Sequence, residues 1–179
     1  MNADDILNFW FQELDQSQWW VKDLAFDQLI TDRFFKIHQS AIACELFEWR
    51  ASPRGRLAEI IILDQFSRNM YRDTPRSFSS DPLALAIAQE AIAADADKRL
   101  SAVERNFLYM PFMHSESIII HEVAVKLYSD NGVDSSIDFE NKHKRIIEKF
   151  GRYPHRNNIL NRTSSNEEIE FLKQPNSSF

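Results

Sequence analysis

Glycine is scarce in this sequence, with three residues among 179. Tight hairpins and turns draw heavily on glycine, so its scarcity favours helices over sheets. Cysteine is scarcer still: Cys44 stands alone, which excludes an internal disulfide and a zinc site built on several cysteines. No apolar run has the length needed to cross a bilayer, and Met1–Asp5 lacks the basic start of a secretory signal. We therefore expect a cytoplasmic protein that makes no membrane contact.

The composition is that of a folded globular chain. Hydrophobic residues make up 44% and charged residues 27% of the sequence, which argues against disorder. The length suits one hydrophobic core. We expect a single all-helical domain over residues 1–179, with a short polar tail at 173–179.

Charge is unevenly distributed along the chain. The net charge of −6 argues against a nucleic-acid partner, which needs a basic surface. Segment 142–162 nevertheless holds seven basic residues and one acid, Glu148, so it carries +6 and the remainder carries −12. A local cationic patch suits a small anionic ligand or an acidic peptide as partner. Four of the basic residues are expected to be solvated surface: Lys142, Lys144, Arg145 and Lys149.

Capping residues and prolines predict a compact bundle of seven to eight helices with short links. Ser52–Pro53 opens a helix to about Asn69 whose apolar residues surround the axis, so this should be the buried central helix. Residues 15–18 should form a loop, and Pro111 should mark a boundary or kink. Other helices are expected to start at Asp4, at Asp23 and at a Ser101–Glu104 capping box. Further helices are expected over Asp81 to about Ala96, His114–Tyr128 with an end at Asn131–Gly132, Ile137–Phe150 with an end at Gly151, and Glu167–Leu172.

Two charged residues stand out on the central helix. Asp64 and Arg68 lie four positions apart in an otherwise apolar helix, where an ion must be paired or must line a cavity. One interpretation is a structural ion pair. The other is that Arg68 projects into a pocket and Asp64 holds it there. Arg76 follows in a polar loop, and its position alone favours a solvated side chain.

A carboxylate and two histidines mark the next motif. If a helix starts at His114, Glu116 falls on its core-facing arc and needs a donor, for which an arginine from another motif is the natural partner. A buried structural pair is the alternative to a site. His114, Glu116, His121 and Glu122 are also potential metal ligands. Their spacing is not H-E-x-x-H, so no metal is expected.

The densest polar run is the proline-stiffened bend at Phe150–Asn157. Arg152, His155 and Arg156 offer planar donors suited to carboxylate or phosphate, although a basic run after a helix end could simply complement the helix dipole. No nucleophile motif and no glycine-rich phosphate loop occurs, so no cofactor is expected. Cys44 is expected to pack in the core.

Four motifs in order resemble the bacterial family catalogued as domain of unknown function 924. They are Leu63–Asn69, Thr74–Arg76, Tyr109–Glu116 and Phe150–Asn157, joined by Phe9–Phe11 and Ser177–Phe179 near the ends. The resemblance covers nearly the whole chain and implies an all-helical fold similar to tetratricopeptide repeats, with no established activity. The family pattern usually has proline in place of Ser67 and glycine in place of Asp73, and relatives commonly have glutamine in place of His121.

Three functions remain open from the sequence. The first is a cleft that binds a small anionic ligand or an acidic peptide end through Arg68, Arg76, His114, Glu116, Arg152, His155 and Arg156. The second is an enzyme in the same cleft, with His114 or His155 as general base and arginines stabilising negative charge. The third is a helical scaffold for protein partners, with a groove lined by aromatic residues such as Trp19 and Trp20. Catalytic residues and oligomeric state stay open.

Overall fold

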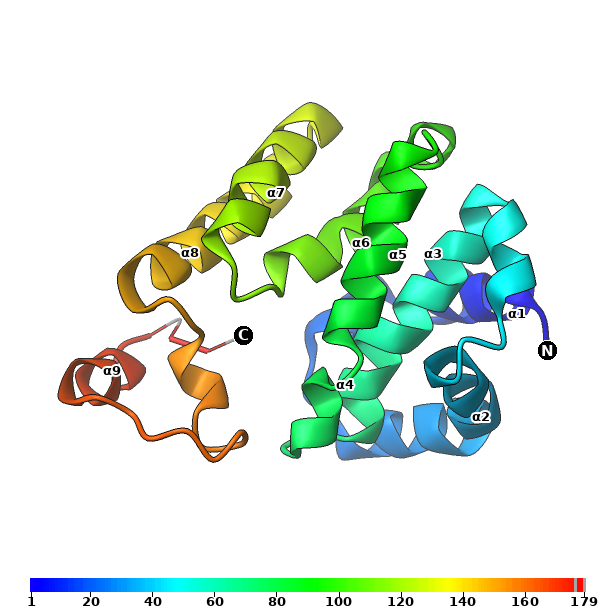
Figure 1. The fold of residues 1–179 in the computed structure, drawn as a ribbon. Coiled ribbons are helices and arrows are strands. Elements are labelled where there is room, and N and C mark those ends of the chain that lie inside the picture. Colours follow the sequence, from blue (N-terminus) through cyan, green and yellow to red (C-terminus); the bar gives the residue numbers. More distant parts are fainter. Residues whose placement is uncertain (176, 179) are drawn as a thin grey trace. The chain divides into compact units, whose positions relative to one another are not determined.

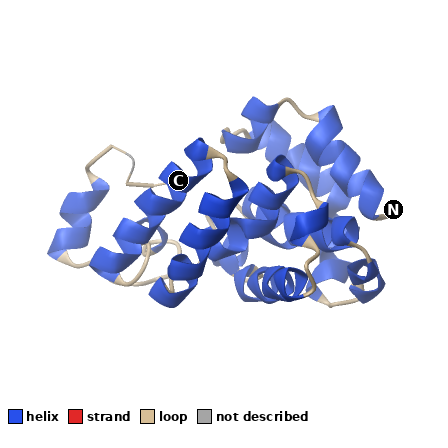
Figure 2. Cartoon of the chain, turned by 90° about the horizontal axis from the view of Figure 1, so that it is seen from above, coloured by secondary structure: helices blue, strands red, loops and turns tan. Residues whose placement is uncertain are grey.

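A computed structural model describes residues 1–175, 177 and 178 of the chain. Helices and their connecting loops make up this part of the chain, and no strand occurs in it (Figure 2). The predicted all-helical class is therefore confirmed, while the likeness to tetratricopeptide repeats stays a prediction. None of the helices described is long and apolar enough to cross a membrane. Phe179, part of the terminal motif, lies outside the described residues.

The chain divides into two compact units. Unit 1 comprises Met1–Arg72 and Arg76–Pro111, and unit 2 comprises Asp73–Pro75 and Phe112–Phe179. The division after Pro111 falls inside helix α6 (Ala102–Met113), where the sequence predicted a boundary or kink. The expectation of a single domain stays a prediction, and each unit is described separately.

Unit 1 is organised around the predicted central helix. This helix consists of α3 (Pro53–Ile61), a wider π-helical turn at Ile62–Phe66 and α4 (Ser67–Met70). Every residue from 57 to 67 is buried, which confirms the prediction. In Figure 1, α3 lies beside α1 and α5, and α2 runs past α4. The bounds of these neighbours are α1 Ala3–Asn8, α2 Leu24–Ile42 and α5 Asp81–Ala93.

Aromatic side chains fill the core of unit 1. Phe9 contacts Phe34 and Phe66 with ring centroids 4.7 and 6.1 Å apart, and Trp10 meets Phe107 edge to face at 5.7 Å. All five are nearly inaccessible to solvent. Such pairs add to the free energy gained by burying their area. The heavy aromatic content of the sequence is thus used to build this core.

Unit 2 contains a pair of long helices followed by a short one. Helices α7 (Ile118–Asn131) and α8 (Asp134–Phe150) pack side by side as a hairpin (Figure 1). Gly132 and Gly151 follow their C-termini in the left-handed conformation, with φ of 71° and 67°, which glycine adopts without a Cβ penalty. Both predicted helix ends are therefore confirmed. Helix α9 (Asn166–Leu172) begins with a capping box between Ser165 and Glu168.

Several predicted helix starts were wrong. Asn2, not Asp4, caps α1, because its side chain accepts the amide hydrogen of Asp5. Helix α5 starts at Asp81 itself, with Ser80 before it, so the Asp81 carboxylate is available for another partner. Residues 15–18 do not form a plain loop, because Asp15 caps a 3-10 helix at Gln16–Trp20.

The start of α7 is a larger correction. Helix α6 continues past Pro111 because Phe112 and Met113 are buried, and α7 begins only at Ile118. Glu116 therefore lies in the link between helices and not on a helix face. The prediction that Cys44 packs in the core was also wrong. Cys44 follows α2 with a φ of 58°, and its side chain is exposed.

Candidate functional site

The residues predicted to bind a ligand are divided between the two units. Arg68 and Arg76 belong to unit 1, while His114, Glu116, Arg152, His155 and Arg156 belong to unit 2. Their convergence on one cleft stays a prediction. Within each unit, these side chains differ in the residues of the protein that they contact.

Arg68 is held by two carboxylates of unit 1. Its Nη1 lies 3.1 Å from Asp64 Oδ1 and donates to the Asp64 carbonyl at 2.7 Å, and its two Nη atoms contact both oxygens of Asp81 at 3.0 and 3.1 Å. Asp64 is almost completely buried. The predicted ion pair between Asp64 and Arg68 is present, and Asp81 adds a bidentate partner. This arrangement braces the central helix against the start of α5.

Arg76 has a different environment. It lies in the short helical turn Pro75–Phe78, and its side chain is exposed. The guanidinium carbon sits 3.9 Å from the centre of the Tyr71 ring, and Nη2 donates to the Tyr71 hydroxyl at 2.9 Å. No carboxylate pairs with Arg76 in the part of the chain that the structure describes. Cation–π stacking thus fixes a guanidinium whose charge is not neutralised by an acid.

A partly buried hydrogen-bond chain supports Tyr71. Gln39 on α2 donates from Nε2 to the Tyr71 hydroxyl at 3.2 Å and lies 3.3 Å from His38 Nδ1. His38 Nε2 lies 2.8 Å from the Ser67 hydroxyl. Burial lowers the pKa of His38 to about 4, and the nearby Arg76 charge lowers it in the same direction. His38 is therefore a neutral ring at neutral pH, and it accepts from Gln39 while donating to Ser67.

Glu116 forms the central polar contact of unit 2. Its Oε1 accepts from the Tyr153 amide at 2.7 Å, and Arg162 pairs with both carboxylate oxygens at 2.6 and 2.9 Å. Burial works to raise the pKa of Glu116, but these hydrogen bonds and the nearby Arg156 charge outweigh it and hold the pKa below its usual value. The expected arginine partner is thus present. It is Arg162, which the site prediction did not include.

Arg152 stabilises the end of the chain that the structure describes. Its Nε and Nη2 donate to the two oxygens of Glu168 at 2.7 and 2.8 Å, and Nη2 also donates to the Thr163 carbonyl at 2.9 Å. Glu168 is buried and caps α9 through Ser165. The Arg152 hydrogen bond lowers the pKa of Glu168 to about 2. The donors of Arg152 are therefore engaged in holding α9.

Arg156 and the neighbouring histidines surround the buried Tyr153 ring. The Arg156 guanidinium lies 4.7 Å from the ring centre, and Nη2 donates to the His114 carbonyl at 3.0 Å. The His155 and His143 rings lie 5.5 and 5.8 Å from Tyr153, centre to centre. Arg156 is buried, whereas His114 and His155 are half-buried. The predicted residues of the bend therefore do cluster, around a tyrosine rather than around an open cavity.

A histidine–carboxylate pair lies inside the same unit. His121 Nδ1 is 2.7 Å from Glu140 Oε1, and neither side chain has any solvent exposure. His121 Nε2 lies 2.9 Å from the Ser115 carbonyl, so this nitrogen carries a hydrogen. Burial raises the pKa of Glu140 despite the opposing hydrogen bond from His121. This pair is sealed in the core, and it does not involve His114 or His155, the two histidines considered as general bases.

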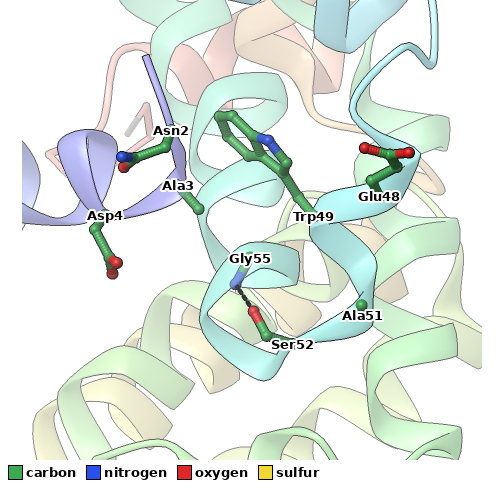
Figure 3. A pocket seen from close by; sticks show the side chains of 8 residues that line it. All are labelled: Asn2, Ala3, Asp4, Glu48, Trp49, Ala51, Ser52 and Gly55. Carbon is green, nitrogen blue, oxygen red and sulfur yellow. Dashed lines mark hydrogen bonds between the residues drawn. The ribbon is translucent and has the colours of Figure 1, made fainter.

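A hollow of about 460 Å³ opens in unit 1, and none of the predicted site residues lines it. Figure 3 shows Trp49 between the Glu48 side and the Asn2 side of this hollow, with the Gly55 amide donating to Ser52 below it. Its lining contains no arginine, lysine or histidine, nor Trp19 or Trp20. Among the described residues, no cluster of three His, Cys, Asp or Glu side chains is placed to hold a metal ion.

Three residues that organise these contacts were missed in the sequence. Tyr71 lies in the polar loop before Arg76 and Tyr153 lies in the Phe150–Asn157 bend, and the sequence predicts a role for neither; Arg162 stands out only as one charge of the basic segment. A usable signal was available for the tyrosines: each lies within a polar stretch that also contains arginines. For Arg162 no local pattern distinguishes it from the solvated Arg145, since its partner lies 46 positions away.

Comparisons with known proteins give a family model and a similar solved structure. The model of a family described as a bacterial protein of unknown function, DUF924, matches residues 6–176. A solved structure of a protein of unknown function from Agrobacterium tumefaciens is similar, with 38% identity, 96% of each chain covered and a TM-score of 0.91. A search of curated proteins finds no match.

Proposed function

The chain belongs to the bacterial DUF924 family, and from that premise we propose that it binds a small anionic ligand, or the acidic group of a peptide, through Arg76. The observation that carries this proposal is the state of the Arg76 guanidinium. It is exposed, fixed on Tyr71, and has no acidic partner in the described part of the chain.

The comparison with the other predicted arginines supports this choice. The Arg68 guanidinium pairs with Asp64 and Asp81, and the Arg152 guanidinium donates hydrogen bonds to Glu168 and Thr163. A guanidinium already paired with carboxylates must lose those bonds before it can bind an anion. Arg76 loses none of its contacts with Tyr71 when an anion approaches the other edge of its guanidinium.

Preorganisation adds to the affinity. A long exposed arginine normally loses rotamer freedom when it binds, at a cost of roughly 0.5–1.5 kcal/mol. Tyr71, held in turn by Gln39, already fixes the Arg76 side chain. Binding therefore costs less conformational entropy at Arg76 than at the solvated Arg145.

Anion titration tests the proposal. A bare anion should bind with a Kd of about 1 mM, equivalent to about 4 kcal/mol. We expect phosphate or acetate at 20 mM to raise the Tm of the native chain, and Arg76→Ala to abolish the increase. Arg145→Ala removes the same charge from an exposed position and should leave the increase intact.

A second variant tests the predicted residues of unit 2. The alternative proposal is an anion site in unit 2 formed by His114, Glu116, Arg152, His155 and Arg156, and Arg156→Ala removes the arginine that lies over Tyr153. If Arg156→Ala abolishes the response while Arg76→Ala keeps it, the anion site belongs to unit 2 and the assignment to Arg76 is wrong. Indifference of the native chain to every anion contradicts anion binding altogether.

A further inference from the structure

We infer that a single proton, shared between His121 on α7 and Glu140 on α8, holds the α7–α8 hairpin together and makes unit 2 sensitive to alkaline pH. This inference goes beyond the proposed anion site and does not depend on it. It follows from the hydrogen-bond partners of the two side chains and from their complete burial.

Both ring nitrogens of His121 face oxygen acceptors. Nε2 lies 2.9 Å from the Ser115 carbonyl and 3.2 Å from the Tyr153 hydroxyl, which gives its own hydrogen to the Met113 carbonyl at 2.5 Å. Nδ1 lies 2.7 Å from Glu140 Oε1. A neutral imidazole carries one hydrogen, and Nε2 uses it. The short contact between Nδ1 and Oε1 therefore needs a second hydrogen, which the ring and the carboxyl group share.

Burial makes this second hydrogen hard to remove. Neither side chain has any solvent exposure, and Glu140 Oε2 has no hydrogen-bond partner in the part of the chain that the structure describes. Without the proton, a buried carboxylate would face the lone pair of Nδ1, and two acceptors in contact repel each other. Burial raises the pKa of Glu140, although the hydrogen bond from His121 and the charge of Lys144 act to lower it. The pair therefore keeps its proton at neutral pH.

Other ionisable groups lie on the elements packed around the pair. They are His143 and Lys144 on α8, Tyr153, His155 and Arg156 in the bend after α8, and His114 and Glu116 in the link before α7. His143 is uncharged at neutral pH because burial lowers its pKa to about 3. Lys144 forms an ion pair with Glu148 at 3.2 Å. None of these groups donates to Glu140 Oε2 within the described residues, so the shared proton has no replacement there.

Proton counting gives the direction of the effect. In an unfolded chain a glutamate releases its proton near about pH 4.3 and a histidine near about pH 6.5, so above about pH 7 the unfolded state has lost the proton that the folded pair still holds. A state that binds one more proton is weakened as the pH rises, by up to roughly tenfold in the folding equilibrium per pH unit. Unit 2 should therefore loosen progressively at alkaline pH.

Hydrogen exchange of the full chain between about pH 7 and 9 tests the inference. The measured quantity is the protection of α7 and α8 amides relative to an unstructured amide at the same pH, which removes the intrinsic pH dependence of exchange. In the native chain, protection should fall by up to roughly tenfold per pH unit. Glu140→Gln offers Nδ1 an amide hydrogen that does not titrate, so its protection should change by less than about twofold per pH unit. Glu122→Gln, an exposed position on α7 beside His121, is the matched control and should behave like the native chain.

The pH dependence decides the outcome. The neighbouring ionisable groups are the same in the native chain and in both variants, so their contribution cancels in the comparison. Equal slopes in the native chain and Glu140→Gln, or no slope in the native chain, overturn the inference. If Glu140→Gln does not fold, the native chain still provides a test by NMR: a strongly deshielded hydrogen signal from the contact between Nδ1 and Oε1 should persist at about pH 8, and its absence overturns the shared proton.

Discussion

Replacing Glu116 with glutamine is the sharpest test of how unit 2 is held together. The carboxylate accepts three hydrogen bonds, two from Arg162 and one from the Tyr153 amide. A glutamine keeps an oxygen for Tyr153 but turns an NH2 group toward Arg162 Nη1, so a donor meets a donor. The half-buried Arg162 also loses its counter-charge.

The expected cost follows from these contacts. A hydrogen bond to a charged group contributes about 1.5–3 kcal/mol, and breaking a fully buried ion pair costs about 3–5 kcal/mol. Glu116 and Arg162 keep 26% and 23% of their side-chain exposure, so solvent screens part of the loss. We therefore expect Glu116→Gln to lower the free energy of unfolding of unit 2 by about 2 kcal/mol, a factor of roughly 30 in the equilibrium constant.

Hydrogen exchange is the appropriate assay. The four tryptophans, Trp10, Trp19, Trp20 and Trp49, all lie in unit 1, so tryptophan fluorescence does not report on unit 2. Amides of α8 should exchange roughly 30-fold faster in Glu116→Gln. Glu170→Gln, which removes an exposed carboxylate paired with Lys173, should change them by less than about twofold. Equal effects of the two variants would refute the structural role assigned to Glu116.

Three further predictions follow. Burial lowers the pKa of His143 to about 3, so the unfolded state takes up a proton at a higher pH than the folded state does. Stability should therefore fall as the pH drops from about 6.5 toward 3, by up to ~1.4 kcal/mol per pH unit. In His143→Gln, the urea midpoint should depend less on pH. Gly55→Ala places a Cβ 1.9 Å from the Trp49 carbonyl oxygen and should lower the urea-derived stability by about 2–3 kcal/mol. Gly132→Ala meets no atom, and its cost should be the left-handed backbone strain alone, about 1–2 kcal/mol. Cys44 should react with a thiol reagent equally fast in native and urea-unfolded protein; slow native reaction contradicts its exposure.

Much of the fold could be predicted from the sequence because local signals decide it. Each helix boundary signal involves only residues within four positions of one another. The signals at the predicted boundaries are Ser52–Pro53, the Ser101–Glu104 box, Gly132 and Gly151. The start of α7 was misplaced because a proline is a local stop signal. Burial of Phe112 and Met113, a tertiary effect, carries α6 past it.

The candidate site was less predictable for the same reason. The sequence indicates that Arg68 and Glu116 need partners, but the partners Asp81 and Arg162 lie 13 and 46 positions away. Arg76 was judged a solvated loop residue from position alone, and its exposure agrees. Its stacking on Tyr71, which distinguishes it from other surface arginines, depends on the turn between α4 and α5.

Observation of the Arg76 side chain during an anion titration tests the central claim most directly. With 15N-labelled protein at constant ionic strength, the Arg76 Nε–H signal, assigned by its loss in Arg76→Lys, should shift along a saturating curve as acetate is added. The Arg145 signal should change only slightly and without saturation. If Arg76 behaves like Arg145, this arginine is ordinary solvated surface and the proposed anion site is contradicted.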